Sequence, residues 1–216
     1  MTDADALRLH RVEIRLRQQR LMEPLDLEVH PGQCVTVMGP SGSGKSTLLN
    51  FIAGTLDPVF EARGRVFVGA HCLDHVEPQH RGIGILFQDD LLFPHLSVGG
   101  NLAFALPALV RGRSARRERV AAALSEAGLA GFAERDPATL SGGQRARVAV
   151  MRTLLAEPRA LLLDEPFSKL DAKLRGEFRA FVFEHARSLS LPVLLVTHDE
   201  ADAAAAGGPI VQLGTV

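Results

Sequence analysis

The stretch CVTVMGPSGSGKST, residues 34–47, constrains the fold of this chain more than any other part of the sequence. CVTVM is a nearly continuous apolar run, which is typical of a parallel strand covered on both faces. Lys45 to Ala53 has a helical pattern, with Gly54 as the expected stop. Between them, Gly39 to Ser46 fits G-x-x-x-x-G-K-[ST], the pattern of a phosphate-binding loop. A buried strand, this loop and a helix in that order predict an α/β fold.

The chemistry of phosphate binding explains the residues of this loop. Its glycines let backbone N–H groups point inward, and the helix start adds the positive end of its dipole. Lys45 is expected to reach the β- and γ-phosphates of a nucleotide, and the Ser46 hydroxyl to ligate Mg²⁺. A glycine-rich turn that only caps a helix is the alternative, which the flanking strand and helix disfavour. The predicted nucleotide-binding residues are Gly39, Pro40, Ser41, Gly42, Ser43, Gly44, Lys45, Ser46 and Thr47.

Further short apolar runs predict the rest of the sheet structure. VEIRL and LDLEV, before the loop, alternate apolar and charged residues as half-exposed antiparallel strands do, whereas LLLD (161–164) and VLLVT (193–197) are typical of buried parallel strands. GRVFV, IGILF and IVQL are also predicted strands, and helical patterns cover 116–127, 142–156 and 171–189. We therefore expect a P-loop NTPase core with a mostly parallel sheet, an N-terminal antiparallel β subdomain and an inserted helical subdomain. The core with its β subdomain is expected at about 1–93 and 160–216, and the helical subdomain, which lacks strand patterns, at about 94–159.

Composition and charge exclude several classes of protein. A net charge of -1 argues against general nucleic-acid binding, and no apolar run is long enough to span a bilayer. The first residues show no secretory signal, and Cys34 and Cys72 lack the spacing of a zinc site or a disulfide framework; Cys34 is expected in the core. The basic cluster RGRSARRER (111–119) fits a solvated helix start better than a nucleic-acid or lipid contact.

LLLDEP, residues 161–166, is the expected companion of the phosphate-binding loop. Its strand brings Asp164 to the carboxyl edge of the sheet, where α/β proteins bind ligands. There Asp164 can hold Mg²⁺ through water, and Glu165 can orient or deprotonate the water that attacks the γ-phosphate. An acidic pair that caps the next helix is the alternative, which the phosphate-binding loop in the same chain makes less favoured.

LSGGQ, residues 140–144, predicts a second anion site. Ser141, Gly142 and Gly143 open a helix whose first N–H groups and hydroxyl can bind phosphate, followed by Gln144. One nucleotide does not need two complete phosphate sites from one face. We infer that the second site closes over a nucleotide held by another copy, as in a two-fold dimer.

Taken together, these motifs resemble those of the ATP-binding cassette (ABC) ATPases, the nucleotide-hydrolysing subunits of ABC transporters, over nearly the full length and in the family's order. The resemblance implies ATP as the substrate, Mg²⁺ as the cofactor and a homodimer. It also implies three roles. Gln88 in ILFQDD is similar to the glutamine that touches Mg²⁺ and the attacking water. Asp171 in SKLD is similar to the aspartate at the dimer interface, and His198 in VTHDE to the histidine that contacts the γ-phosphate. Without the resemblance, Gln88 reads as a polar residue at a strand end and His198 as a capping residue.

The segment FQDDLLFPHLSV is similar to the importer class of this family. The resemblance implies permease subunits that dock near Gln88 to Leu96, with Phe93, Pro94, His95 and Leu96 lining the groove. It also implies indirect work with a solute-binding protein and a peripheral place at the cytoplasmic face of the cell membrane. No C-terminal regulatory domain is expected, and small importers of the thiamine, iron or polyamine kind are the nearest match.

Other functions stay open at this point. One is lipid or lipoprotein export. A second is a soluble ABC protein of repair or translation, which the lack of a second cassette or a coiled-coil insertion disfavours. A third is a non-catalytic regulator, which the intact Glu165 and His198 disfavour.

Two positions depart from the family pattern. Leu16 stands where family members stack the adenine on an aromatic side chain, and the first aromatic residue is Phe51. The loss of stacking, on the order of 1 kcal/mol, predicts weaker base selectivity or nucleotide affinity. Lys169 stands where the family has a small residue. It is either a surface lysine or a charge at the dimer interface.

Overall fold

The computed structural model describes residues 5–17 and 19–214, and all statements below refer to these. They form two compact units. The first contains the residues up to 85, Arg159–Glu165 and the residues from 179 on, and the second contains Leu86–Pro158 and Pro166–Phe178. The second unit thus includes residues 94–158 of the predicted helical segment 94–159, together with 86–93 and 166–178, whereas Arg159 belongs to the first unit.

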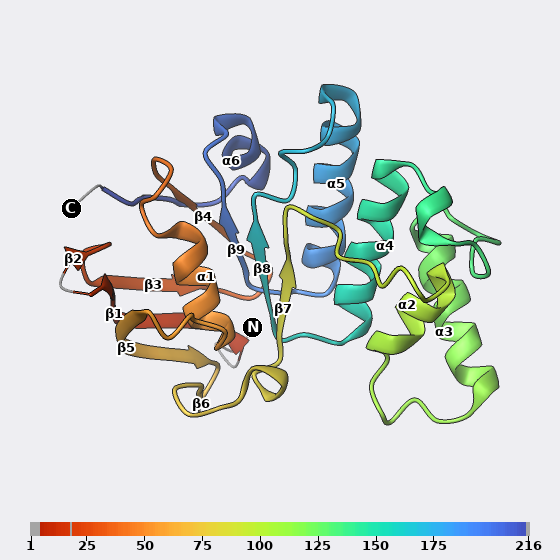
Figure 1. Cartoon of the computed structure of the whole chain (residues 1–216), viewed down its shortest axis with the longest axis horizontal. Coiled ribbons are helices and arrows are strands. Elements are labelled where there is room, and N and C mark those ends of the chain that lie inside the picture. Colours follow the sequence, from red (N-terminus) through yellow and green to blue (C-terminus); the bar gives the residue numbers. More distant parts are fainter. Residues whose placement is uncertain (1–4, 18, 215–216) are drawn as a thin grey trace. The chain divides into compact units, whose positions relative to one another are not determined.

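A parallel sheet in the first unit positions the predicted nucleotide site. Its strand order is β10 (Ile210–Gln212), β4 (Cys34–Met38), β9 (Val193–Val196), β8 (Ala160–Asp164) and β7 (Ile83–Leu86). Figure 1 shows β4, β9, β8 and β7 side by side. All residues of β4 and β9 are buried, as expected of apolar strands covered on both faces.

The second sheet of this unit is antiparallel. Its long strand β1 (Leu7–Leu16) pairs with β2 (Gln19–Arg20), β3 (Leu25–Val29) and β5 (Phe60–Val68), and β5 pairs with β6 (His71–Cys72). Arg11 interrupts β1 with a φ of 48° where the register to both neighbours shifts, which marks a β-bulge. The two halves of β1 keep their apolar side chains on the buried face.

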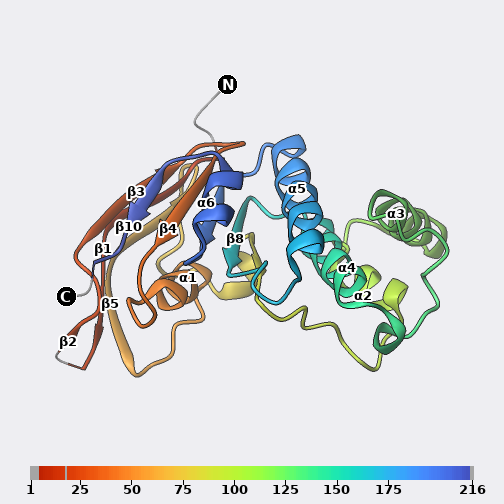
Figure 2. The same cartoon turned by 90° about the horizontal axis from the view of Figure 1, so that it is seen from above.

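Helix α1 (Lys45–Ala53) packs between the two sheets. Leu48, Leu49 and Ile52 are buried in one apolar cluster with residues of both sheets, such as Ile14 and Leu162. Figure 2 shows the helix beside β4 and β5. The core therefore holds the start of α1 against the end of β4.

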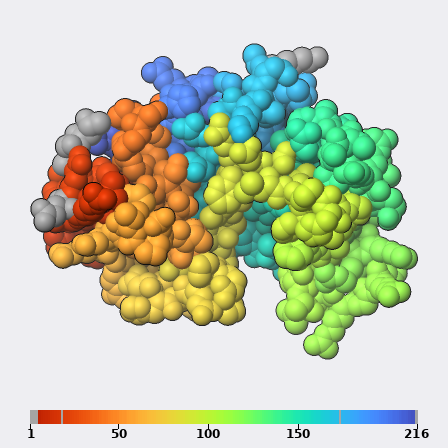
Figure 3. Space-filling model, viewed as in Figure 1, coloured from red at the N-terminus to blue at the C-terminus, as the bar shows by residue number. Residues whose placement is uncertain are grey.

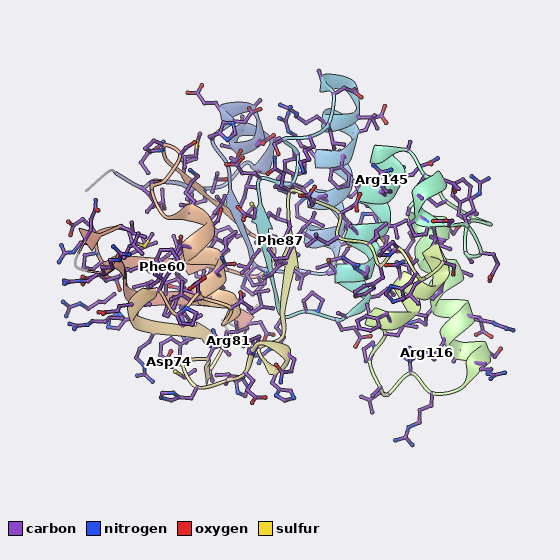
Figure 4. The ribbon with its side chains drawn as sticks, in the orientation of Figure 1. Phe60, Asp74, Arg81, Phe87, Arg116 and Arg145 are labelled. Atoms are coloured by element: carbon purple, nitrogen blue, oxygen red, sulfur yellow. The ribbon has the colours of Figure 1, made fainter. Side chains whose placement is uncertain are left out.

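Arg81 closes the other end of α1. Its guanidinium group donates hydrogen bonds to the carbonyls of Phe51 and Ile52 at 3.1 and 2.8 Å (Figure 4). Gly54 ends the helix with a φ of 81°, and a Cβ there would lie 2.5 Å from Arg81 Nε. The left-handed conformation favours glycine at this position, and a larger residue would also have to displace the Arg81 guanidinium group from the end of α1.

The second unit is helical. It contains α2 (Val98–Ala105), α3 (Arg113–Glu126), α4 (Gly142–Leu155) and the first turns of α5 (Ala172–Ser188), which continues into the first unit. Arg116 of α3, labelled in Figure 4, donates to the carbonyls of Ala103 and Val110 and so fixes the connection from α2. The first unit also holds α6 (Glu200–Ala206). Among the residues described, no helix combines the length and apolarity needed to cross a membrane.

Both cysteines are free thiols. Cys34 is buried in β4 as predicted, and its burial raises the pKa of the thiol to about 12. Helices α2 and α6 and the short strands β2 and β6 were not expected from the sequence.

Candidate functional site

The loop after β4 has the backbone of a phosphate cradle. Gly42 and Gly44 have φ values of 84° and 86°, a backbone conformation that residues with a Cβ adopt only at a cost in free energy. A Cβ on Gly39 would lie 2.8 Å from both the Leu213 carbonyl oxygen and Ser43 Oγ. The glycines at 39, 42 and 44 are therefore needed for this loop shape.

Lys45 folds back over the loop. Its Nζ donates to the carbonyls of Gly39 and Pro40 at 2.8 and 2.9 Å, and its side chain is buried. Helix α1 starts after Gly44 without a side-chain cap. The first turn of the helix therefore offers backbone N–H groups and a positive dipole end beside a buried ammonium group, a combination that favours an anion.

Ser46 and Asp164 meet although 118 positions separate them in the sequence. Ser46 Oγ donates to Asp164 Oδ1 at 2.9 Å, and Asp164 ends β8, two strands from β4 in the sheet. Burial raises the pKa of Asp164, and the neighbouring Glu165 adds to this effect, while Ser46 and Lys45 oppose it. A partly buried carboxylate and a hydroxyl next to a phosphate loop are oxygen donors of the kind that Mg²⁺ prefers.

Glu165 and His198 form the third part of the site. His198 Nδ1 lies 3.1 Å from Glu165 Oε1. Glu165 has a φ of 47°, a left-handed conformation that is unusual for a residue with a side chain, and its N–H donates to Val196 at 3.0 Å. Strained backbone of this kind is found at functional sites, where the surrounding structure must hold it.

Leu16, the predicted adenine contact, lies at the end of β1. Its cross-strand partners are Gln19 and Phe60. Directly opposed residues of an antiparallel pair point to the same face, so an aromatic side chain accompanies Leu16 there. Phe60, labelled in Figure 4, was missed in the sequence because the register of β1 with β5 cannot be read from either strand alone.

The remaining predicted residues belong to the second unit. Gln88 is exposed just after β7, in a segment that lines a cavity of about 150 Å³ together with Gly142, Arg145 and Lys169. Arg145 Nε donates to Asp90 at 2.9 Å, and Arg145 is labelled in Figure 4. Lys169 forms an ion pair with Asp89. Within this unit, Lys169 thus pairs with the segment that follows Gln88.

Ser141 to Gln144 start helix α4 with a reciprocal cap. Ser141 Oγ accepts from the Gln144 N–H at 3.3 Å, and Gln144 Oε1 accepts from the Ser141 N–H at 3.0 Å. Gly142 is exposed and Gly143 is buried, where a Cβ would lie 2.6 Å from the Leu174 side chain. Asp171 is exposed, and its Oδ1 accepts from the Leu174 N–H at 3.0 Å, so it caps the start of α5.

One buried residue organises the segment predicted to contact a permease. Asn101 in α2 is fully buried, and its Nδ2 donates to the carbonyls of Phe93, Leu96 and Ser97 while its Oδ1 accepts from the Phe93 N–H. Phe93 and Leu96 are half-buried, and Pro94 and His95 are exposed. Figure 3 shows part of this segment on the surface of its unit, in yellow to yellow-green. Asn101 was not noticed in the sequence, because an asparagine inside an apolar run carries no pattern.

Comparison with known proteins places these motifs in a family. The ABC transporter family profile matches residues 22–168, which include the phosphate loop, Gln88, the LSGGQ segment and Asp164–Glu165. The chain belongs to the ABC transporter family. The predicted family is thereby confirmed.

Curated relatives support the same conclusion. An uncharacterised ABC transporter ATP-binding protein of Escherichia coli, YnjD, is 52% identical over 88% of both chains. The Fe(3+) ions import ATP-binding protein FbpC of Streptomyces avermitilis is 43% identical over 96% of this ABC chain and 59% of the relative. The maltose/maltodextrin import ATP-binding protein MalK of Salmonella typhimurium is 42% identical over 88% of this chain and 50% of the relative. The chain thus spans only about half the length of the last two.

Solved structures confirm the predicted fold class. This chain is similar to the dimeric structure of MJ0796, a bacterial ABC transporter cassette, with a TM-score of 0.78 and 31% sequence identity. The match covers 96% of this chain and 94% of the MJ0796 chain. A structure of the same cassette in a post-hydrolysis state, bound to ADP and Pi, gives a TM-score of 0.79 at 30% identity.

Proposed function

We propose that this chain is the ATP-hydrolysing subunit of an ABC importer. One observation carries the proposal. Three parallel strands, β4, β9 and β8, end at one edge of the sheet in the Lys45 loop, His198 and the Asp164–Glu165 pair. The carboxyl ends of parallel strands are where such sheets bind ligands and perform chemistry.

In this proposal the loop Gly39–Thr47 binds the phosphates of ATP. Lys45 now contacts two loop carbonyls. A γ-phosphate offers the ammonium group an anionic acceptor instead, so the Coulomb attraction of two opposite charges adds to the hydrogen bond. Leu16 and the neighbouring Phe60 would contact the base.

The donor set fits magnesium. Ser46 Oγ and the Asp164 carboxylate are hard oxygen ligands, and no cluster of three or more His, Cys, Asp or Glu side chains competes as a metal site among the described residues. Ser46 and Asp164 would hold the ion, directly or through water, and for Gln88 of the second unit the family resemblance alone supports a role as a ligand. Bound Mg²⁺ would neutralise charge on the phosphates.

Glu165 is proposed as the general base. Its carboxylate takes a proton from the water that attacks the γ-phosphorus, the bond to the β-phosphate oxygen breaks, and ADP and phosphate are released. His198 Nδ1, 3.1 Å from Glu165 Oε1, restricts the orientation of that carboxylate and would contact the γ-phosphate.

Ser141–Gln144 and Asp171 are proposed to act on the nucleotide of a second copy. The reciprocal cap supports this role, because the Ser141 oxygen accepts from its own helix and its hydrogen is left to donate to a phosphate. The dimeric form of the similar cassette is a further support.

The segment from Gln88 to Leu96 is the proposed docking site for membrane permease subunits. Leu91 is 54% exposed and Phe104, which packs edge-on against Phe93, is 68% exposed. Exposed apolar side chains next to a segment fixed by Asn101 are suited to bind an apolar partner helix. The chain would thus be peripheral at the cytoplasmic face of the membrane, with a solute-binding protein acting indirectly.

The names of the relatives support import without selecting a cargo. Relatives named for import of Fe(3+), 2-aminoethylphosphonate and maltose are 42–43% identical to this chain. Similar identity to proteins with such different cargoes supports the proposal that the permease and the solute-binding protein, rather than this subunit, recognise the solute.

Phosphate release from MgATP and the oligomeric state at saturating MgATP test the proposal. We expect Glu165→Gln to lose hydrolysis by at least 100-fold, because it lacks the base, and to accumulate as an ATP-bound dimer in light scattering. Glu184→Gln, an exposed position of α5, is the matched control and should hydrolyse like the wild type. Unchanged turnover in Glu165→Gln would remove Glu165 from the mechanism, and a monomer at saturating MgATP would contradict the two-copy site.

A further inference from the structure

A buried ion pair lies behind His198 and has no part in the mechanism above. Arg179 of α5 and Asp202 of α6 both belong to the first unit, and the guanidinium group donates to Asp202 Oδ1. Asp202 is 2% exposed. The Arg179 side chain is 15% exposed, so the pair is largely buried, and desolvation of the two charges offsets part of their attraction.

The pair is connected to both neighbours of His198 in the chain. Asp202 Oδ2 accepts from Thr197 Oγ1 at 3.0 Å, and Thr197 Oγ1 in turn accepts from the Asp199 N–H at 3.0 Å. Arg179 Nη2 also lies 3.6 Å from Asp199 Oδ2. Residues 197 and 199, on the two sides of the histidine, are therefore both connected to the guanidinium group of Arg179, residue 197 through Asp202.

His198 itself has little other support. Its side chain is 62% exposed, and among the described residues the Glu165 carboxylate is its one charged neighbour at hydrogen-bond distance. Because the exposed imidazole makes few other contacts, its distance to Glu165 depends on how firmly the backbone at residue 198 is held.

We propose that Arg179 is a positioning residue for His198. Through Asp202 and Thr197 it holds residues 197–199 so that the imidazole stays within hydrogen-bond reach of the Glu165 carboxylate. The proposal rests on the proposed ATP hydrolysis, and it adds to that mechanism a residue that does not contact the nucleotide.

Steady-state ATP hydrolysis by Arg179→Met tests the positioning role. We expect kcat to fall about 10-fold with KM for ATP changed less than 2-fold, because the phosphate loop is untouched. The kcat of Arg179→Lys should lie between those of the wild type and Arg179→Met, because lysine keeps the charge but lacks the forked donors that reach both aspartates. Arg119→Met is the matched control, since it removes an exposed arginine paired with Glu157 and should leave kcat unchanged.

Two further variants separate positioning from folding. Thr197→Val keeps the Arg179–Asp202 pair but removes the hydroxyl bridge, and it should also lower kcat. In a His198→Ala background, Arg179→Met should cause no further loss of kcat. An equal fold-loss with and without His198, or unchanged kcat in both Arg179→Met and Thr197→Val, overturns the proposal.

A measurement that does not depend on ATP hydrolysis tests the positioning role separately from the proposed function. The NMR signal of the His198 ring, assigned with His198→Ala, should move in the same direction in Arg179→Met as in Glu165→Gln, and stay in place in Arg119→Met. If the wild type does not hydrolyse ATP, the proposed function fails, and this signal still decides the positioning role. An unmoved signal in Arg179→Met overturns it.

Discussion

Replacing Asn101 by leucine removes four hydrogen bonds between its amide group and the backbone of residues 93–97. The Phe93 and Ser97 carbonyls keep other backbone donors, the N–H groups of Leu96 and Asn101. The Phe93 N–H loses its acceptor. At about 1 kcal/mol for each bond lost, and a partial gain from the buried leucine, the free energy of unfolding should fall by about 3 kcal/mol.

Urea unfolding followed by circular dichroism at the helical band measures this change. Intrinsic tryptophan or tyrosine fluorescence does not serve, because the sequence contains neither residue. For a chain of this length, a loss of that size corresponds to a midpoint of thermal unfolding lower by roughly 6–12 °C. If the proposed permease docks on this segment, its association should weaken as well, because residues 93–97 lose the hydrogen bonds to Asn101.

Ser97→Ala is the control for this prediction. It removes only the cap at the start of α2, where Ser97 Oγ accepts from the Gly100 N–H at 3.1 Å, and should cost about 1 kcal/mol. The reasoning is wrong if Asn101→Leu changes the free energy of unfolding by no more than Ser97→Ala does.

Two further variants probe the proposed nucleotide site. Because burial raises the pKa of Asp164, the folded state disfavours the ionised carboxylate and loses stability as the pH rises through that pKa. Asp164→Asn should therefore raise the thermal midpoint of the nucleotide-free protein at pH 7, by an amount that shrinks towards pH 3, while MgATP hydrolysis is lost; a lower midpoint at pH 7 would contradict the sign. Leu16→Tyr should strengthen ATP binding relative to GTP, on the order of 1 kcal/mol in a titration, because it adds an aromatic face for the base. Equal discrimination before and after the exchange would count against a base contact at Leu16.

Elements whose ends are set by local chemistry could be predicted from the sequence. The predicted bounds of α1, Lys45 to Ala53, agree with the structure, because a loop glycine starts the helix and Gly54 stops it. The LDLEV strand is found as β3 with the same bounds, since its alternating pattern matches a half-buried strand.

Contacts between distant parts of the chain could not be predicted. Helix α2 carries two glycines and an asparagine, a composition with weak helix propensity, and its start is stabilised by Ser97 and Asn101. The opposition of Leu16 and Phe60 depends on strand register, and the Arg179–Asp202 pair joins two helices. In each case the information lies in a partner that local periodicity does not reveal.

The two carbonyls that Lys45 contacts have a consequence for the loop itself. The ammonium group of Lys45 donates to the carbonyls of Gly39 and Pro40, so the first residue of α1 is bonded back to the start of the loop. Lys45→Met would therefore remove these two hydrogen bonds within the loop as well as the attraction for phosphate. Its affinity for ATP should therefore fall by more than the loss of the Coulomb attraction between ammonium and phosphate alone.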